Sequence, residues 1–230
     1  MPETLEIGQP PISVELRRNA SAKRMTLRVS SVDGAARLTL PKRSSLRSAK
    51  RFLIDQEGWL RGHIGKRPER VAIQAGLEIS LEGEMFFLGE HSGARVVLAP
   101  GQIILPAGRP AGMALERFIK TRARAVITDL VKQDAGTLGR DFGKISLRDP
   151  RSRWGSCNSE GNLMFSWRLL LAPQAVLRYV VAHEVAHLAE MNHSAAFWAE
   201  VEGLMPDYAP ERAWLKQNGG DLHRYDFKSA

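Results

Sequence analysis

The chain has 230 residues, enough for one large domain or two small ones, and its 43% hydrophobic content excludes a bulk disordered protein. Its only cysteine is Cys157, which excludes an internal disulfide and a cysteine-based zinc cage. No basic segment followed by an apolar run opens the sequence, and no stretch approaches the roughly 18 apolar residues of a membrane span. We therefore expect a cytoplasmic protein without a membrane partner.

The net charge of +8 is unevenly distributed along the chain. Residues 1–70 contain 15 Lys and Arg but only 7 Asp and Glu, whereas residues 71–230 contain 18 of each kind. A local basic excess attracts polyanions, so a nucleotide or a nucleic acid is a candidate partner of residues 1–70. A solvated basic surface without a specific partner is the alternative interpretation.

The first third of the chain favours strands and one helix. Short alternating runs of apolar and polar residues predict strands between Ile12 and Pro41. The Asp33-Gly34 pair between two of these runs predicts a hairpin turn. Residues 45–64 then have the spacing of an amphipathic helix, with arginine and lysine opposite an apolar stripe.

Strand patterns return before the middle of the chain. They are separated by glycines and occur at residues 77–81, 85–88, 95–98 and 102–105. Residues 106–112 include two prolines and two glycines, which predicts a linker. We expect this linker to end a β-rich, basic N-terminal portion with one helix, residues 1–110.

The remaining residues favour helices over strands. A long helix is predicted from about Met113 to Asp134, and Pro173 predicts the start of another that runs to about Met191. The other predicted elements are a strand at 144–148, a hairpin around 159–162, and helices at 194–206 and 210–217. The whole pattern predicts an α+β chain, with a second lobe formed by residues 111–230.

The sequence His183-Glu184-Val185-Ala186-His187 lies in the predicted helix that Pro173 opens. Residues four apart occupy the same face of a helix, so both imidazoles can bind one metal ion at about 2.0–2.1 Å. Glu184 is rotated by about 100° around the helix, which keeps its carboxylate off the metal but near a metal-activated water. The motif therefore predicts a zinc site with Glu184 as general base. Two histidines in purely structural roles are the alternative.

A catalytic zinc site needs a third protein ligand, and His193 is our choice. Asn192 can turn the chain after the helix and Ser194 can cap the next one, which would hold His193 close to the metal. A carboxylate from the following helix, Glu200 or Glu202, is the alternative ligand.

The segment 151–157 combines two arginines, a tryptophan and a glycine directly before the predicted hairpin. We predict that Arg151, Arg153 and Trp154 form a wall of the substrate site, with an arginine that polarises a carbonyl or pairs with a carboxylate. A turn packed by Trp154, with both arginines in solvent, is the alternative.

Three other side chains are weaker candidates. Cys157 favours the role of a small buried hydrophobic residue over that of a redox or inhibitory thiol. His223 or Tyr225 in the C-terminal tail could fold back and stabilise an oxyanion, although structural roles are the simpler interpretation.

The chain resembles the YgjP-like metallopeptidase family, which is related to SprT-type and other zincin-fold peptidases. The resemblance rests on 21–29, 38–41, 153–157, Trp167, Leu169, 179–187, 192–194, Phe197 and Trp198. It implies a zincin-like lobe, zinc bound by His183, His187 and His193, and Glu184 as the catalytic carboxylate. The chain departs from the family pattern at Ser166, where asparagine is usual, and from the metzincin pattern at Glu190, where metzincins have glycine.

We therefore predict a zinc-dependent hydrolase that cleaves peptides or proteins, with Glu184 as general base. One alternative is a metal-dependent nucleotide phosphoanhydride hydrolase in which Arg151 or Arg153 holds phosphates. The other is an SprT-like peptidase that associates with nucleic acid through residues 1–70.

Overall fold

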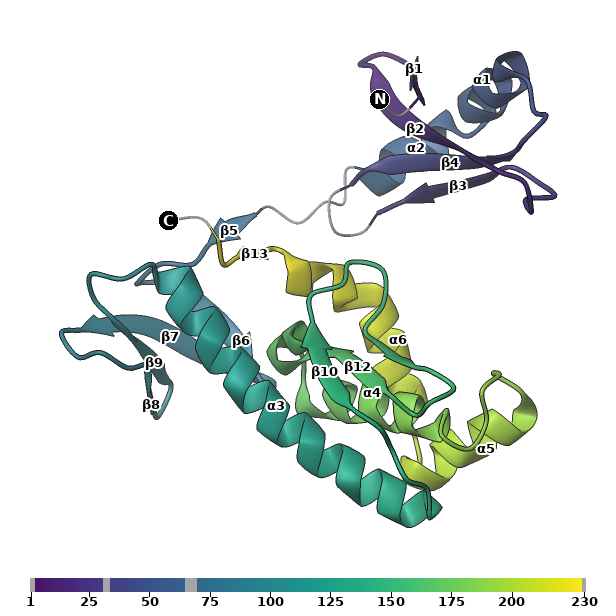
Figure 1. The fold of residues 1–230 in the computed structure, drawn as a ribbon. Helices are drawn as coiled ribbons and strands as arrows, with labels where there is room; N and C mark the ends of the chain where they lie inside the picture. Colours follow the sequence, from purple (N-terminus) through teal and green to yellow (C-terminus); the bar gives the residue numbers. More distant parts are fainter. Residues whose placement is uncertain (1–2, 31–33, 65–69, 229–230) are drawn as a thin grey trace. The chain divides into compact units, whose positions relative to one another are not determined.

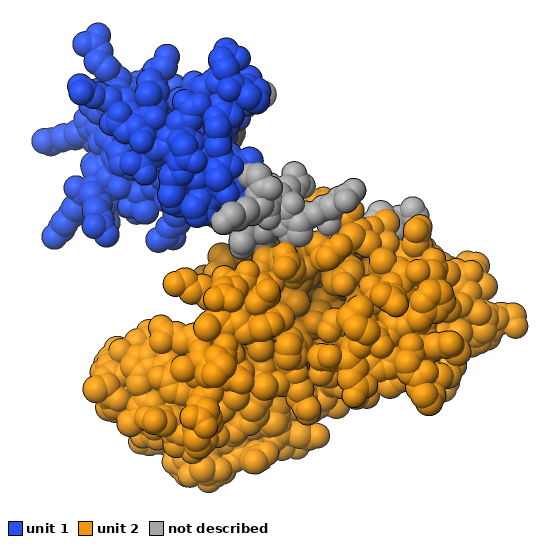
Figure 2. Space-filling view, turned by 180° about the vertical axis from the view of Figure 1, so that it is seen from behind, with its two compact units in different colours: residues 1–69 blue, residues 70–230 orange. Residues whose placement is uncertain are grey.

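The computed structural model describes residues 3–30, 34–64 and 70–228 (Figure 1). The chain divides into two compact units, residues 1–69 and residues 70–230, named unit 1 and unit 2 (Figure 2). Each unit has its own cluster of buried apolar residues, so each is built around its own hydrophobic core. The mixture of sheets and helices confirms the predicted α+β class.

Unit 1 contains a four-stranded sheet in the order β1-β2-β4-β3. The strands β2 and β4 are parallel, and the two outer pairs are antiparallel. The bounds are β1 Glu3–Ile7, β2 Ile12–Asn19, β3 Thr26–Val29 and β4 Ala36–Pro41. The antiparallel pairing of β3 with β4 is that of the predicted hairpin, but its expected turn residue Asp33 lies outside the described residues.

The single helix predicted over residues 45–64 is two helices, α1 (Leu46–Asp55) and α2 (Glu57–Ile64). The chain leaves the helical conformation at Gln56, where φ is −103° and ψ is 8°. Ser45 caps α1, because its hydroxyl accepts a hydrogen bond from the Ser48 backbone N–H. The predicted apolar stripe does face the core of unit 1, where Leu53 and Leu60 are fully buried.

Unit 2 begins with a second four-stranded sheet in the order β6-β7-β9-β8. Its strands are β6 (Glu78–Leu81), β7 (Glu84–His91), β8 (Val97–Ala99) and β9 (Gln102–Pro106), which confirms the four predicted strands. The long helix α3 (Ala111–Leu138) shares a core with this sheet through Leu115 and Ile119. It ends at Gly139, whose φ of 61° is the left-handed conformation of a helix cap.

The boundary between the two compact units lies after residue 69, whereas the sequence led us to expect two portions, 1–110 and 111–230. Ile79, Leu88 and Ile103, from the sheet β6–β9, belong to the same core as α3. Apolar packing between this sheet and α3 thus places residues 70–110 in the unit that also contains the His183-Glu184 motif. The prolines and glycines at 106–112 predicted a linker, but the packing of the sheet against α3 could not be predicted from local sequence patterns.

The rest of unit 2 carries the functional motif. A three-stranded sheet has the order β10-β12-β11, so β11 is an edge strand. Its strands are β10 (Ile145–Arg148), β11 (Gly155–Cys157) and β12 (Leu163–Ser166), and β5 (Val71–Ala72) pairs with β13 (Tyr225–Asp226). The helical elements are η1 (Trp167–Leu171), α4 (Gln174–Ala186), α5 (Ala195–Leu204), α6 (Ala209–Asn218) and η2 (Gly219–His223).

Helix α4 ends at Ala186 rather than near Met191 as predicted. The backbone N–H groups of Leu188 and Ala189 bond to carbonyls only three residues earlier, which tightens the chain into a turn. His187 is therefore the C-cap of α4 and still has helical dihedral angles, so the motif keeps its helical spacing. No described helix is both long enough and apolar enough to cross a membrane.

Candidate active site

Helix α4 is buried on most of its surface, which fixes the position of the motif. The buried residues include Val180, Val181 and Val185, and the helix packs against α3, α5, α6 and β11. His183 and His187 lie where this apolar surface gives way to a cleft. The apolar residues that flank the motif in sequence therefore anchor the helix that presents both imidazoles.

Three histidines converge at this cleft. One ring nitrogen from each of His183, His187 and His193 lies within 4.8 Å of the others. The Nε2 atoms of His183 and His193 are 3.1 Å apart. Among the described residues, neither Glu200 nor Glu202 joins this group, so the structure brings together the three histidines chosen from the sequence.

This arrangement suits a metal ion. Two nitrogens bound to one tetrahedral zinc at about 2.0–2.1 Å would lie about 3.3 Å apart, close to the 3.1 Å between His183 and His193. His187 Nδ1 is 3.0 Å from the Glu190 carbonyl oxygen, which orients the ring and leaves Nε2 free for the cluster. This contact could not be predicted from the sequence, because it depends on the tight turn after α4.

Two of these imidazoles, those of His183 and His187, are also held in the form that binds metal. Burial and, to a smaller extent, the nearby His187 and His193 lower the pKa of His183 to about 4. Burial likewise lowers the pKa of His187. Metal ligands must be neutral imidazoles, so near neutral pH no proton has to leave these two rings when a metal binds.

An apolar ring closes one side of the cluster. The fully buried Phe197 lies 5.0 Å from His183, 4.4 Å from His187 and 4.8 Å from His193 between ring centroids. It is held at the start of α5, where its backbone N–H donates to the hydroxyl of Ser194. The predicted cap at Ser194 is therefore present, and it sets the wall behind the histidines.

Glu184 follows His183 on α4, lines the same cleft and is 6% exposed. Burial raises the pKa of its carboxyl to about 7, and Arg153 acts in the opposite direction. The adjoining residue of β11 is Gly155, where a Cβ atom would lie 2.4 Å from Glu184 Cγ. Only glycine allows β11 to pass this close to the carboxylate, a role that the sequence signalled only as a glycine beside a tryptophan.

The histidine cluster and Glu184 open into one cleft of about 570 Å³. The edge strand β11 and residues 152–154 form one wall, and residues of α4 line the cleft beside them. Of the predicted substrate residues, Arg153 and Trp154 line the cleft, whereas Arg151 is not among its lining residues. Their roles in binding substrate stay predictions.

The weaker candidates have different positions. Cys157 is half-buried at the cleft, and burial together with the charge of Glu184 raises the pKa of its thiol, which disfavours the reactive thiolate. His223 and Tyr225 do not line the cleft. His223 instead lies against Trp154, with 5.1 Å between ring centroids and 32° between the ring planes.

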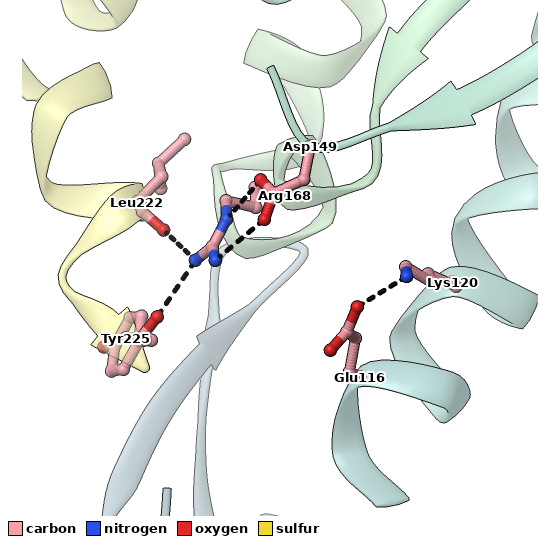
Figure 3. A network of polar contacts seen from close by, with 6 residues as sticks. All are labelled: Glu116, Lys120, Asp149, Arg168, Leu222 and Tyr225. Carbon is pink, nitrogen blue, oxygen red and sulfur yellow. Dashed lines mark hydrogen bonds and ion pairs between the residues drawn. The ribbon is translucent and has the colours of Figure 1, made fainter. Parts of the chain in front are cut away.

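A buried arginine connects the C-terminal tail to the segment that leads into the cleft (Figure 3). Arg168 binds both carboxylate oxygens of Asp149, at 2.7 and 3.1 Å. Its guanidinium also donates to the carbonyl oxygens of Leu222 and Tyr225, at 3.0 and 3.1 Å. These two carbonyls flank His223, so Arg168 fixes the tail that supports Trp154. Sequence analysis missed this residue, although a charged side chain within an apolar run was a signal.

Comparisons with known proteins show the family to which the chain belongs. The sequence model of one family, described as "YgjP-like, metallopeptidase domain", matches residues 23–218. Two solved structures are similar to part of the chain, the metallopeptidase zymogens abylysin of Pyrococcus abyssi and jannalysin of Methanocaldococcus jannaschii. Abylysin is 23% identical, with a TM-score of 0.36, over 40% of this chain and 92% of its own.

Jannalysin is 18% identical, with a TM-score of 0.35, over 40% of this chain and 94% of its own. A comparison with curated proteins gave no match. The family match covers most of the chain, including both histidines of the α4 motif, His193 and the cleft wall formed by β11. The chain therefore belongs to the YgjP-like family and carries its metallopeptidase domain, with a histidine triad typical of a zinc-binding site.

Proposed function

We propose that this protein hydrolyses peptide bonds with a zinc ion held by His183, His187 and His193, and with Glu184 as general base. One observation carries the proposal. The buried carboxylate of Glu184 lies in the same cleft as the three histidines and directly beside the edge strand β11. A base, a metal site and a backbone edge for substrate thus lie together.

The donor set supports zinc as the metal. Three neutral imidazoles are a common catalytic zinc set, and they leave a fourth position open. A zinc ion bound there supplies a Lewis acid that acidifies the attacking water and polarises the scissile carbonyl. The protein's own contribution is to bring three imidazoles together and, through burial, to keep those of His183 and His187 neutral. The contact of His187 with the Glu190 carbonyl orients that ring.

Glu184 is suited to moving protons in both directions. Burial raises the pKa of its carboxyl to about 7, so near neutral pH it can accept a proton and return it. We assign it to take the proton from the attacking water and to deliver that proton to the leaving amine. The absence of a side chain at Gly155 leaves the carboxylate room beside the substrate path.

The substrate would bind as an extended strand along β11. One backbone edge of β11 pairs with β12, and residues 155–157 line the cleft. A peptide that adds to this edge brings its carbonyl groups past Glu184, which is strand addition as used in many peptide sites. Arg153 can then polarise a carbonyl or pair with a carboxylate, and Trp154 can pack against a substrate side chain.

A Glu184→Gln variant tests the proposal. Loss of the general base should reduce kcat on an unfolded protein substrate by about 10²–10⁴-fold while zinc content stays unchanged. Glu202→Gln, an exposed residue of α5, is the matched control and should keep full activity. Nucleoside triphosphates should be assayed in parallel. If Glu184→Gln cleaves protein as fast as wild type, or if only nucleotides are hydrolysed, the proposal is wrong.

A further inference from the structure

Unit 2 has a second groove, of about 730 Å³, which shares no residue with the metal cleft. It lies between the N-terminal half of α3, the segment before β8 and the segment between β9 and α3. Its walls are formed by Ala94, Arg95, Val96, Pro106, Arg109, Pro110, Met113, Ala114, Arg117, Phe118 and Thr121. The function proposed for the metal cleft does not use this groove.

The charges around this groove have one sign. Arg95, Arg109 and Arg117 line it, and no lining residue is acidic. In the described parts of the chain, none of these three arginines forms an ion pair or donates a side-chain hydrogen bond. Two other arginines of α3 are engaged, because Arg122 pairs with Glu82 and Arg124 donates to the Ile145 carbonyl. The groove thus concentrates positive charge that the protein itself does not neutralise.

Apolar side chains are exposed in and beside the same groove. Met113, on α3, lines the groove and is 63% exposed, whereas Val97 and Leu98 of the adjoining strand β8 are 45% and 40% exposed but do not line it. Val96 and Phe118 also line the groove, and apolar side chains gathered at one groove are typical of a binding surface. A ligand that suits this groove therefore combines negative charge with apolar groups.

The strand β8 adds a backbone element to this surface. It begins directly after the groove residues 94–96. Among the described strands it pairs with β9 alone, at the edge of its sheet, while β6 at the opposite edge packs against η1. None of the three residues of β8 is charged or a proline, and those are the features that commonly protect an edge strand. Its free N–H and C=O groups can pair with an extended peptide.

We propose that this groove binds an extended peptide segment rich in acidic and apolar residues. The segment would place carboxylates toward the arginines and apolar side chains against Met113 and Phe118, and its backbone would continue along the edge of β8. A second copy of this chain is a poorer occupant, because the chain carries a net charge of +8. The groove would hold an acidic segment of a partner protein at a distance from the metal cleft.

A binding measurement tests this inference without relying on catalysis. The probe is a short, fluorescently labelled peptide of alternating Glu and Leu, and a Lys and Leu peptide is the matched control. Fluorescence anisotropy with the full chain should show binding of the acidic probe only, and the binding should weaken with added salt. Mass spectrometry of the recovered probe shows whether it was cleaved, which separates failure of this inference from failure of the proposed hydrolysis.

Variants locate the binding site. The double variant Arg109→Glu/Arg117→Glu should raise the Kd for the acidic probe by about tenfold or more. Arg140→Glu makes the same kind of charge change at the other end of α3, where the residue is exposed, and should leave the Kd nearly unchanged. Met113→Gln, which keeps the charge, should weaken binding by loss of apolar contact. Absence of binding, equal binding of the basic probe, or equal effects of the groove and Arg140 variants would each overturn the inference.

Discussion

Gly155 determines how closely the wall of the cleft approaches the catalytic carboxylate. A Cβ atom added at Gly155 would overlap Glu184, because it would lie 2.4 Å from Glu184 Cγ and 2.6 Å from Glu184 Oε1. Both atoms belong to a side chain that is buried and cannot swing away into solvent. The position of the general base therefore depends on one missing side chain.

Replacing Gly155 with alanine should lower kcat/KM by about a hundredfold, because either β11 or the Glu184 carboxylate must move by a distance that misplaces the base. Zinc content should stay near wild type, since the atoms nearest to the added Cβ belong to Glu184 and not to the three histidines. Gly136→Ala, in α3, is the matched control because no atom lies within 4 Å of its added Cβ. Equal activity of Gly155→Ala and wild type would contradict the close approach of β11 to Glu184.

His223 should make the stability of the protein depend on pH. Burial lowers its pKa from 6.5 to about 4, with Arg168 and Arg151 acting in the same direction and Asp149 opposing them. Because the unfolded state then binds the proton first, the free energy of unfolding should fall as the pH is lowered from about 6.5 to about 4. Chemical unfolding with a chelator present should therefore show a smaller loss over this window for His223→Gln than for wild type. Identical pH profiles would show that His223 is not buried as a neutral ring.

At the scale of elements, several features follow from sequence patterns alone. The strands β6 to β9 and the helix α3 were visible because alternation and helical periodicity are local properties. The cap at Ser194 and the turn before it were also local signals, and they led to His193 as third ligand rather than Glu200. Where neighbouring residues determine the structure, the sequence was sufficient.

Other features depend on contacts between distant segments and could not be read locally. Helix α4 ends at Ala186 because its carbonyls accept bonds from a tight turn, not because of a glycine or proline signal. The contact between Gly155 and Glu184 joins residues 29 positions apart, and Arg168 meets Tyr225 across 57. The three histidines and Glu184 could therefore be predicted from the sequence, but the packing that positions them could not.

The Arg168 contacts connect three elements, since they join η1 to the segment after β10 and to the C-terminal tail (Figure 3). The arginine side chain is only 10% exposed, whereas Asp149 is 38% exposed. Gly219, in the same tail, lies against the ring of Trp154, where an added Cβ would come within 3.1 Å. The tail thus supports a wall of the cleft although it does not line it.

Removing this arginine with Arg168→Met should lower the free energy of unfolding by about 3 kcal/mol, because Asp149 loses its ion pair and the carbonyls of Leu222 and Tyr225 lose a charged donor. Arg122→Met breaks a more exposed pair with Glu82, at 40% and 19% exposure, and should cost about 1 kcal/mol or less. Urea unfolding of both variants provides the comparison. Equal losses would mean that the Arg168 contacts are not a structural centre of unit 2.

At the scale of the whole molecule, the basic excess and the metal-binding residues lie in different units. The basic excess of the sequence lies in residues 1–70, almost all of them in unit 1, while the histidine cluster lies in unit 2. A nucleic acid or nucleotide partner for residues 1–70 stays a prediction. The family match extends across both units, from residue 23 to residue 218.

The central claim is that His183, His187 and His193 together hold one metal ion. Elemental analysis of the purified full chain, beside His193→Ala and Glu200→Gln, tests it most directly. We expect about one zinc ion per chain in wild type and in Glu200→Gln, and a large loss in His193→Ala. Absence of zinc from wild type, or loss of zinc in Glu200→Gln with retention in His193→Ala, would contradict the three-histidine site.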